Sequence, residues 1–277
     1  MKTAIALGTF DGIHIAHRRV LSIGDGYKKI AVTFLKPPKM YFTNQDELIM
    51  DYEAKVKALE KMGFCDVVAL DFLKVKDTPP KEFLDFLIAE YNPSLISCGF
   101  NYHFGNNGEG DTALLKEYCK NFGIEYRICD EIDVDGMAVS STYIRNLLKN
   151  GEIDKANSLL FEPFSFSATV EHGDSRGHTI GFPTLNQYYP ENLVKVKFGV
   201  YKTEVTVNDK VYDSFTNIGI RPTFKSERII SETYVKNFSG DLYGKNVKVT
   251  LKEFLREEIK FASLEDLKRQ IEIDKTK

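Results

Sequence analysis

The alternation of short apolar runs with segments of helical periodicity is the feature that most restricts the fold of this chain. In the first half, strand-like runs are predicted at residues 4–7, 29–34, 66–72, 95–98 and 124–128. Helices are predicted between them, through His17 and Leu21 and over 46–62, 79–91 and 112–121. Strands that alternate with helices favour a parallel sheet with helices on both faces. Ligands of such sheets bind at the carboxyl ends of the strands, near the point where the strand order reverses.

The pattern changes after about residue 160, where the chain becomes rich in strands. Two helices are predicted first, at 140–148 and 153–160, and then strands at 166–170, 200–207, 211–217, 229–235 and 246–255. The pair Asn208-Asp209 is a two-residue hairpin turn signal. This pattern is typical of a small antiparallel barrel or sandwich, and a final amphipathic helix is predicted at 263–271 with Ser263 at its N-terminus. Because 277 residues are many for one core, we expect two domains, residues 1–160 and 161–277.

The composition argues against several classes of protein. A net charge of −3 gives no strong field to hold nucleic acid, and no apolar run approaches the roughly 20 residues that span a bilayer. We therefore expect no nucleic-acid and no membrane partner. The apolar stretch at residues 4–7 is too short for a signal peptide and is interpreted as a buried strand. The four cysteines show no CxxC pairing, so reduced thiols, a cytoplasmic location and burial of Cys65 and Cys98 are expected.

The segment GTFDGIHIAH at residues 8–17 is the most informative part of the first half. A glycine beside a strand end lets the backbone approach a phosphate closely. His14 and His17 are three residues apart at a predicted helix start, so both can face one side. Imidazoles beside helix N–H groups suit a polyphosphate. A single histidine would more often cap or pack, but two histidines after this turn favour the phosphate site.

The segment 172–186 of the second half contains three glycines spaced four residues apart, Gly173, Gly177 and Gly181. Such a loop can fold its backbone around phosphate oxygens, although a barrel corner explains the glycines alone equally well. Thr184 and Asn186 lie two residues apart, so both face the same side of an extended chain. Their oxygens could bind Mg²⁺ beside a nucleotide.

Three segments of the first half resemble one superfamily. Residues 8–17 resemble the HxGH signature of the nucleotidyltransferases, in the form Gly-x-Phe-Asp-Gly-x-His-x-Gly-His, with Ala16 in place of the last glycine. Residues 98–105 resemble the Gly-x-Asp-Phe-x-Phe-Gly segment of bacterial bifunctional FAD synthetases, with Asn101 at the aspartate position. Residues 139–145 resemble the Ser-Ser-Thr-x-Ile-Arg motif, in which hydroxyls at a helix start and an arginine one turn later can clamp phosphate. By itself, this last motif could be a simple N-cap with a surface arginine.

This resemblance implies a Rossmann-like domain that joins FMN to an adenylyl group of ATP. The residues implied to hold the triphosphate are His14, His17 and Arg145, assisted by Ser141 and Thr142. The residues implied to shape the nucleotide pocket are Gly8, Phe10, Asp11, Gly12 and Asn101.

The second half is similar to riboflavin kinases. Residues 173–186 match Gly-x-x-x-Gly-x-x-x-Gly-Phe-Pro-Thr-x-Asn, with Leu185 where alanine is usual. The resemblance implies a small antiparallel barrel that binds ATP through the three glycines, Pro183, Thr184 and Asn186, with Mg²⁺ on the last two. It also implies that Glu232 accepts the proton of the riboflavin hydroxyl. From the residues alone, a salt-bridged strand glutamate is the open alternative.

Taken in order, the motifs resemble bacterial bifunctional riboflavin kinase/FAD synthetases over nearly the whole chain. The implied small-molecule partners are riboflavin, FMN, FAD and ATP. Two alternatives stay open at this point: a kinase whose first domain is weakened by Ala16 and Asn101, and a flavin-binding regulator without turnover. The sequence does not determine the oligomeric state.

Overall fold

The computed structural model describes residues 1–43, 47–171, 184–222, 227–259 and 264–274. Contacts divide the chain into two compact units, which are described separately. The first comprises Met1–Ile144 and Leu159–Glu162, and the second comprises Arg145–Ser158 and Pro163–Lys277. The domain boundary near residue 160 stays a prediction, because the segment before it contributes to both units.

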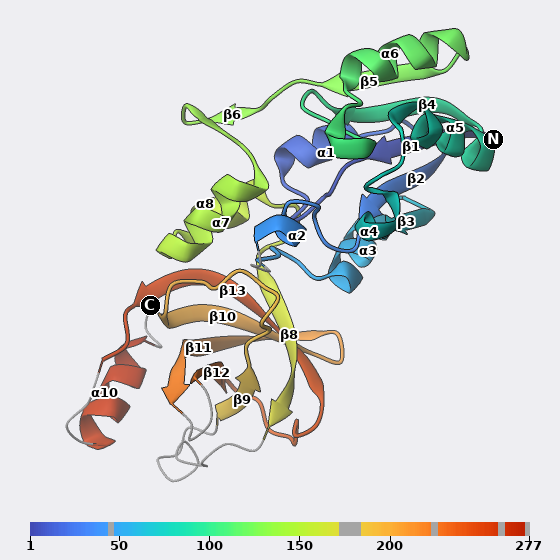
Figure 1. The fold of residues 1–277 in the computed structure, drawn as a ribbon. Helices are drawn as coiled ribbons and strands as arrows, with labels where there is room; N and C mark the ends of the chain where they lie inside the picture. The colour runs from blue at the N-terminus through green and yellow to red at the C-terminus, as the bar shows by residue number, and fades with distance from the viewer. Residues whose placement is uncertain (44–46, 172–183, 223–226, 260–263, 275–277) are drawn as a thin grey trace. The chain divides into compact units, whose positions relative to one another are not determined.

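The first unit is built on a parallel sheet of five strands in the order β3-β2-β1-β4-β5 (Figure 1). The strands are β1 (Lys2–Leu7), β2 (Tyr27–Phe34), β3 (Asp66–Leu70), β4 (Pro93–Gly99) and β5 (Glu125–Cys129). The chain passes outward from β1 to β3 and then returns to β4 on the other side of β1. The strand order therefore reverses between β1 and β4, where this fold class binds its ligands.

Helices cover both faces of this sheet, as predicted. The two larger pairs are α1 (Ile15–Leu21) with α3 (Tyr52–Lys61), and α5 (Pro80–Tyr91) with α6 (Thr112–Asn121). Successive residues of a strand point to opposite faces, and β1 divides accordingly between two buried cores. Ala4 and Ala6 pack with residues of α1 and α3, whereas Ile5 and Leu7 pack with residues of α5 and α6.

Two predicted elements are shorter in the structure because aspartate caps set their boundaries. The helix expected at 46–62 begins only at Tyr52, since Asp51 accepts a hydrogen bond from the Ala54 amide and caps the helix. The strand expected at 66–72 ends at Leu70, because Asp71 caps the short helix α4 (Phe72–Val75).

The sequence did not predict several small elements of the first unit. They are α2 (Met40–Thr43), η1 (Asn106–Gly108) and the hairpin of β6 (Asp133–Val134) with β7 (Met137–Ala138). All four cysteines are free, and Cys98 is buried as expected. The expectation for Cys65 was wrong: it is exposed, because it precedes β3 rather than lying within it.

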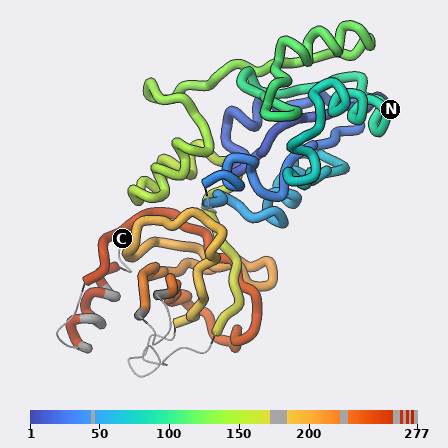
Figure 2. Tube along the Cα trace, viewed as in Figure 1, coloured from blue at the N-terminus to red at the C-terminus, as the bar shows by residue number. Residues whose placement is uncertain are grey.

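The second unit contains a closed barrel of antiparallel strands in the order β10-β11-β12-β9-β8-β13. The strands are β8 (Ser165–Glu171), β9 (Thr184–Tyr188), β10 (Gly199–Val207), β11 (Lys210–Pro222), β12 (Glu227–Val235) and β13 (Asn246–Arg256). The unit also includes most of α7 (Ser141–Asn150) and α8 (Ile153–Leu159). Figure 2 shows β8 beside β13, although they lie far apart in the sequence. The pairing of β13 with β10 closes the barrel. The β10–β11 turn has left-handed residues at Asn208 and Asp209, as its sequence predicted.

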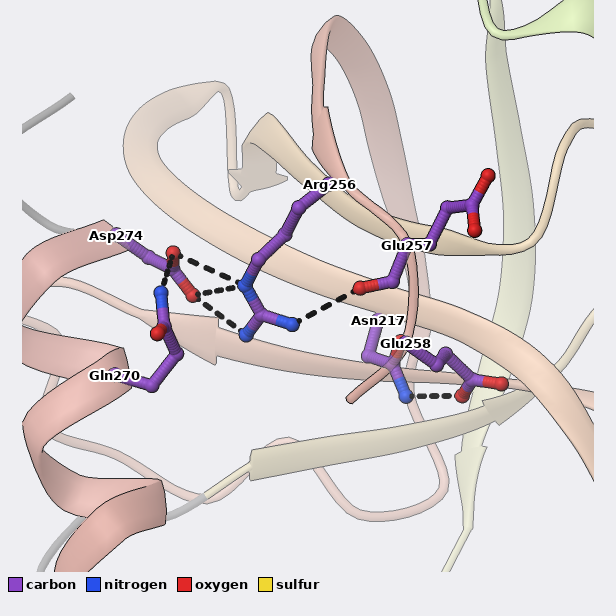
Figure 3. A network of polar contacts seen from close by, with 6 residues as sticks. All are labelled: Asn217, Arg256, Glu257, Glu258, Gln270 and Asp274. Atoms are coloured by element: carbon purple, nitrogen blue, oxygen red, sulfur yellow. Dashed lines mark hydrogen bonds and ion pairs between the residues drawn. The ribbon is translucent and has the colours of Figure 1, made fainter. Parts of the chain in front are cut away.

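A buried ion pair ties the last helix, α10 (Leu264–Asp274), to the barrel (Figure 3). The guanidinium of Arg256, at the end of β13, donates to the Asp274 carboxylate, with an Nη2–Oδ2 distance of 2.7 Å. Gln270 donates to the same carboxylate at 2.9 Å. The Asp274 side chain is only 5% exposed, so it depends on these donors for its solvation. The predicted helix start at Ser263 lies outside the described residues.

We predict that Asp274→Ala releases α10 from the barrel. Removing one partner of a buried pair leaves an uncompensated charge, which costs about 3 kcal/mol. Amide hydrogen exchange of the full chain should therefore show loss of protection in α10. Glu53→Ala, which breaks an exposed pair with Lys57, is the matched control and should leave exchange unchanged. Wild-type protection of α10 in the Asp274 variant would contradict this account.

Candidate functional site

The first candidate site begins with a strained turn at the carboxyl end of β1. Phe10 and Ile13 have positive φ values of 49° and 43°, which residues other than glycine rarely adopt. The Phe10 ring lies against Gly8, where an added Cβ would come within 2.8 Å of the ring. Such conformations persist only where the surroundings hold them, and they gather at functional sites. This turn leads the chain directly into α1.

His14 and His17 form a stacked pair at the start of α1. Their ring centroids are 3.7 Å apart, with 17° between the planes. His14 is the N-cap residue, and its Nδ1 accepts a hydrogen bond from the His17 amide at 3.3 Å. A nitrogen that accepts carries no proton, so in neutral His14 the proton is on Nε2, where it can be donated to a ligand. The predicted pairing of the two histidines on one side is therefore present.

Burial, with help from neighbouring positive charges, keeps His17 neutral. Burial lowers the pKa of His17 well below 6.5, and the nearby His14 and Lys55 lower it further. Within the described part of the chain, the buried Nδ1 of His17 has no hydrogen-bond partner. The ring therefore retains a free polar atom at the start of a helix.

Asp11 connects the turn to two other segments. Its buried carboxylate accepts hydrogen bonds from the Ile49 and Met50 amides, at 2.9 and 3.4 Å. Its backbone carbonyl accepts a hydrogen bond from the Ser141 hydroxyl at 2.9 Å. The histidine segment and the Ser-Ser-Thr segment, 130 residues apart, therefore meet here. Phe10 and Asp11 are both fully buried, so they support the turn from within.

The remaining residues predicted for the first site lie near its edges. Asn101 is exposed two residues after the end of β4, which neighbours β1 in the sheet. Gly12 has a φ of +86°, as a left-handed turn position requires. Thr142 is exposed in the first turn of α7. Arg145 follows on the same helix but belongs to the second unit, so its contact with this site stays a prediction.

Lys55 and Thr33 were missed by the sequence analysis. The Lys55 ammonium donates to the carbonyls of Thr9 and Phe34, at 2.8 and 3.0 Å. The Thr33 hydroxyl donates to the same Thr9 carbonyl at 2.9 Å. A signal was present: Lys55 lies three residues after Tyr52 and four before Leu59, so it falls on the apolar face of its helix. A lysine at a core position is rare without a partner.

The second candidate site lies on one face of the barrel. Asn186 of β9 is paired with Glu232 of β12, and Thr184 is two residues from Asn186 along β9. Directly paired residues share a face, as do alternate residues of a strand. The predicted Mg²⁺ ligands and the predicted base are thus brought together. Gly173, Gly177, Gly181 and Pro183, predicted to bind the nucleotide, lie outside the described residues.

Glu232 forms an ion pair with Arg221 of β11. This is the salt-bridged strand glutamate that the residues alone left open, and the role of Glu232 as base stays a prediction. The predicted metal ligands Thr184 and Asn186 offer a hydroxyl and an amide oxygen, which suit Mg²⁺. Among the described residues there is no cluster of three or more His, Cys, Asp or Glu that could hold a metal.

Comparisons with known proteins match both units. A family model described as FAD synthetase matches residues 1–143, and one described as riboflavin kinase matches residues 160–277. The bifunctional riboflavin kinase/FMN adenylyltransferase of Listeria monocytogenes is 32% identical over 98% of this chain and 89% of its own. The protein of the same name from Bacillus subtilis is 31% identical over 99% of this chain and 90% of its own.

A solved structure from Streptococcus pneumoniae has the same fold. That protein is named a macrolide-efflux protein, and its structure matches with a TM-score of 0.91 and 28% identity, over 99% of this chain and 93% of its own. Among the described residues of the present chain, every helix is too short or too polar to span a membrane.

We predict that His17 titrates well below pH 6.5. Its burial and the neighbouring His14 disfavour the charged ring, so the ring should stay neutral through the physiological range. Nitrogen-15 NMR of the histidine rings measures this directly. His14→Ala removes one of the two charges that act on His17 and should move its midpoint upward. A wild-type midpoint at or above 6.5 would contradict the arrangement.

Proposed function

The chain belongs to the family of bifunctional riboflavin kinase/FMN adenylyltransferases, and from this premise we propose which of its residues carry each reaction. It phosphorylates riboflavin to FMN with ATP, and it then joins FMN to an adenylyl group from ATP, forming FAD and releasing pyrophosphate. The observation that carries this conclusion is that the two family models match separate parts of one chain. The relatives named for both activities cover at least 97% of it.

We assign adenylyl transfer to the turn after β1 and the start of α1. An oxygen of the FMN phosphate attacks the α-phosphorus of ATP, and the bond from that phosphorus to the bridging oxygen breaks. The phosphate is already nucleophilic, so the protein has to position the reactants and neutralise charge. We assign the Nε2 proton of His14 and the neutral ring of His17 to hydrogen bonds with the triphosphate. Arg145, Ser141 and Thr142 are assigned to the same phosphates.

We assign the kinase reaction to the face that carries Asn186 and Glu232. The ribityl hydroxyl of riboflavin attacks the γ-phosphorus of ATP, its proton passes to Glu232, and ADP leaves. Because Arg221 pairs with Glu232, the hydroxyl must share or displace that contact to reach the carboxylate. Thr184 and Asn186 would hold Mg²⁺, which when bound neutralises charge on the transferring phosphate. The register of β9 with β12 supports this grouping.

Neither alternative from the sequence is favoured by the described geometry. Ala16 lies half-exposed on α1, and Asn101 stands exposed at the carboxyl end of β4. The stacked pair of His14 and His17 is present. A pure binding protein would not need a base and a cation site in addition to this pair.

We predict that variants at the two sites separate the two activities. Asn186→Ala should lower FMN formation from riboflavin by on the order of 100-fold while added FMN is still converted to FAD. His17→Ala should do the reverse, with a loss of similar size in FAD formation only. Both rates are measured on each variant by chromatography of the flavins. Equal loss of both activities in either variant would rule out separate sites.

A further inference from the structure

Lys55 places an ammonium group in the interior, at the carboxyl ends of β1 and β2. The residue is only 1% exposed. Besides its bonds to the Thr9 and Phe34 carbonyls, its Nζ lies 3.4 Å from the Thr33 hydroxyl. Burying a lysine is costly, and an apolar side chain of similar length would fill the same space without that cost. The ammonium therefore calls for an explanation beyond packing.

The contacts of Lys55 act on the turn that precedes the histidines. Thr9 lies between Gly8 and Phe10, at the point where the chain leaves β1. Its carbonyl accepts hydrogen bonds from Lys55 Nζ and from the Thr33 hydroxyl. Phe34 is the last residue of β2. Lys55 thus links the end of β2 to the strained turn and fixes the direction in which this turn enters α1.

The charge of Lys55 also acts on the site. The titratable groups that face it are Asp11, on the turn, and His17, on α1, with His14 stacked on His17. Burial lowers the pKa of Lys55 to about 8, although Asp11 opposes this shift. At pH 7 the ammonium is therefore largely charged, whereas His17 is neutral. At pH 7 a buried positive charge therefore lies close to the turn and to the neutral ring of His17.

We propose that Lys55 is a positioning residue for adenylyl transfer, which orients the turn carrying His14 and His17 and supplies a buried positive charge near the bound polyphosphate. This inference rests on the assignment of adenylyl transfer to the first site. Lys55 does not contact the reacting atoms, and it acts through the Thr9 carbonyl and through its field.

The proposal implies a pH dependence that differs between the two activities. The phosphates of ATP and FMN are already ionised at pH 7, so loss of FAD synthesis near pH 8 would reflect an enzyme group. The effect of Lys55 on stability has the opposite sign. Its pKa is lower in the folded chain than the ordinary 10.5, so between about pH 8 and 10.5 its deprotonation favours folding. Unfolding linked to Lys55 therefore cannot imitate the predicted loss of activity.

The test uses the full chain with Lys55→Met, which removes the ammonium and keeps the length of the side chain. Lys57→Met, at an exposed position two residues later on α3, is the matched control. Thr33→Val removes a contact of the Thr9 carbonyl but leaves the charge. For each protein, kcat/KM for ATP is measured from pH 6 to 10 with FMN as acceptor, and again with riboflavin as acceptor.

We expect Lys55→Met to lower kcat/KM for FAD synthesis by on the order of 10- to 100-fold at pH 7 and to abolish the wild-type decline above about pH 8. The kinase rates should not change, and Lys57→Met and Thr33→Val should keep the decline.

Wild-type FAD synthesis without a decline near pH 8, or a Lys55→Met enzyme that retains this decline, would overturn the proposal. If Lys55→Met fails to fold, the wild-type and Thr33→Val profiles still decide. A wild-type protein that makes no FAD from FMN would instead refute the assignment of the first site.

Discussion

The turn at the end of β1 has a strained backbone that buried polar contacts hold in place. The Asp11 carboxylate accepts hydrogen bonds from two backbone amides, and the Thr9 carbonyl accepts one from the Lys55 ammonium. With the turn fixed in this way, His14 caps α1 and stacks on His17. The strand order reverses beside the same turn, so the histidines follow the strand end where sheets of this class bind their ligands. The first site thus depends on the buried hydrogen bonds of Asp11 and Lys55.

The second site depends instead on strand register. The antiparallel pairing of β9 with β12 sets Asn186 opposite Glu232, and a shift of one residue would turn one of them to the other face. The neighbouring strands of the barrel are held together by hydrogen bonds in its interior. The hydroxyl of Thr216 is shared between Thr203 and Thr233, at 2.8 and 2.9 Å. These bonds join β10, β11 and β12 inside the barrel, where water does not compete for them.

The sequence predicted the fold class and the histidine pair because both follow from local patterns. Alternating strands and helices imply the parallel sheet, and the i, i+3 spacing places His14 and His17 on one side. It did not reveal what depends on contacts between distant residues. The link of Lys55 to Thr9 spans 46 residues, and the pairing of Glu232 with Arg221 depends on the barrel register. The late start of α3 after Asp51 and the early end of β3 before Asp71 show that caps outweigh apolar periodicity at element boundaries.

The central claim is that one chain carries two sequential flavin reactions at two separate sites. The most direct test is to incubate the purified protein with riboflavin and MgATP and to follow the flavins over time by chromatography. The account predicts that FMN appears first and then gives way to FAD. FMN that accumulates without FAD would contradict it, because the turn after β1 would then hold its histidines without transferring an adenylyl group.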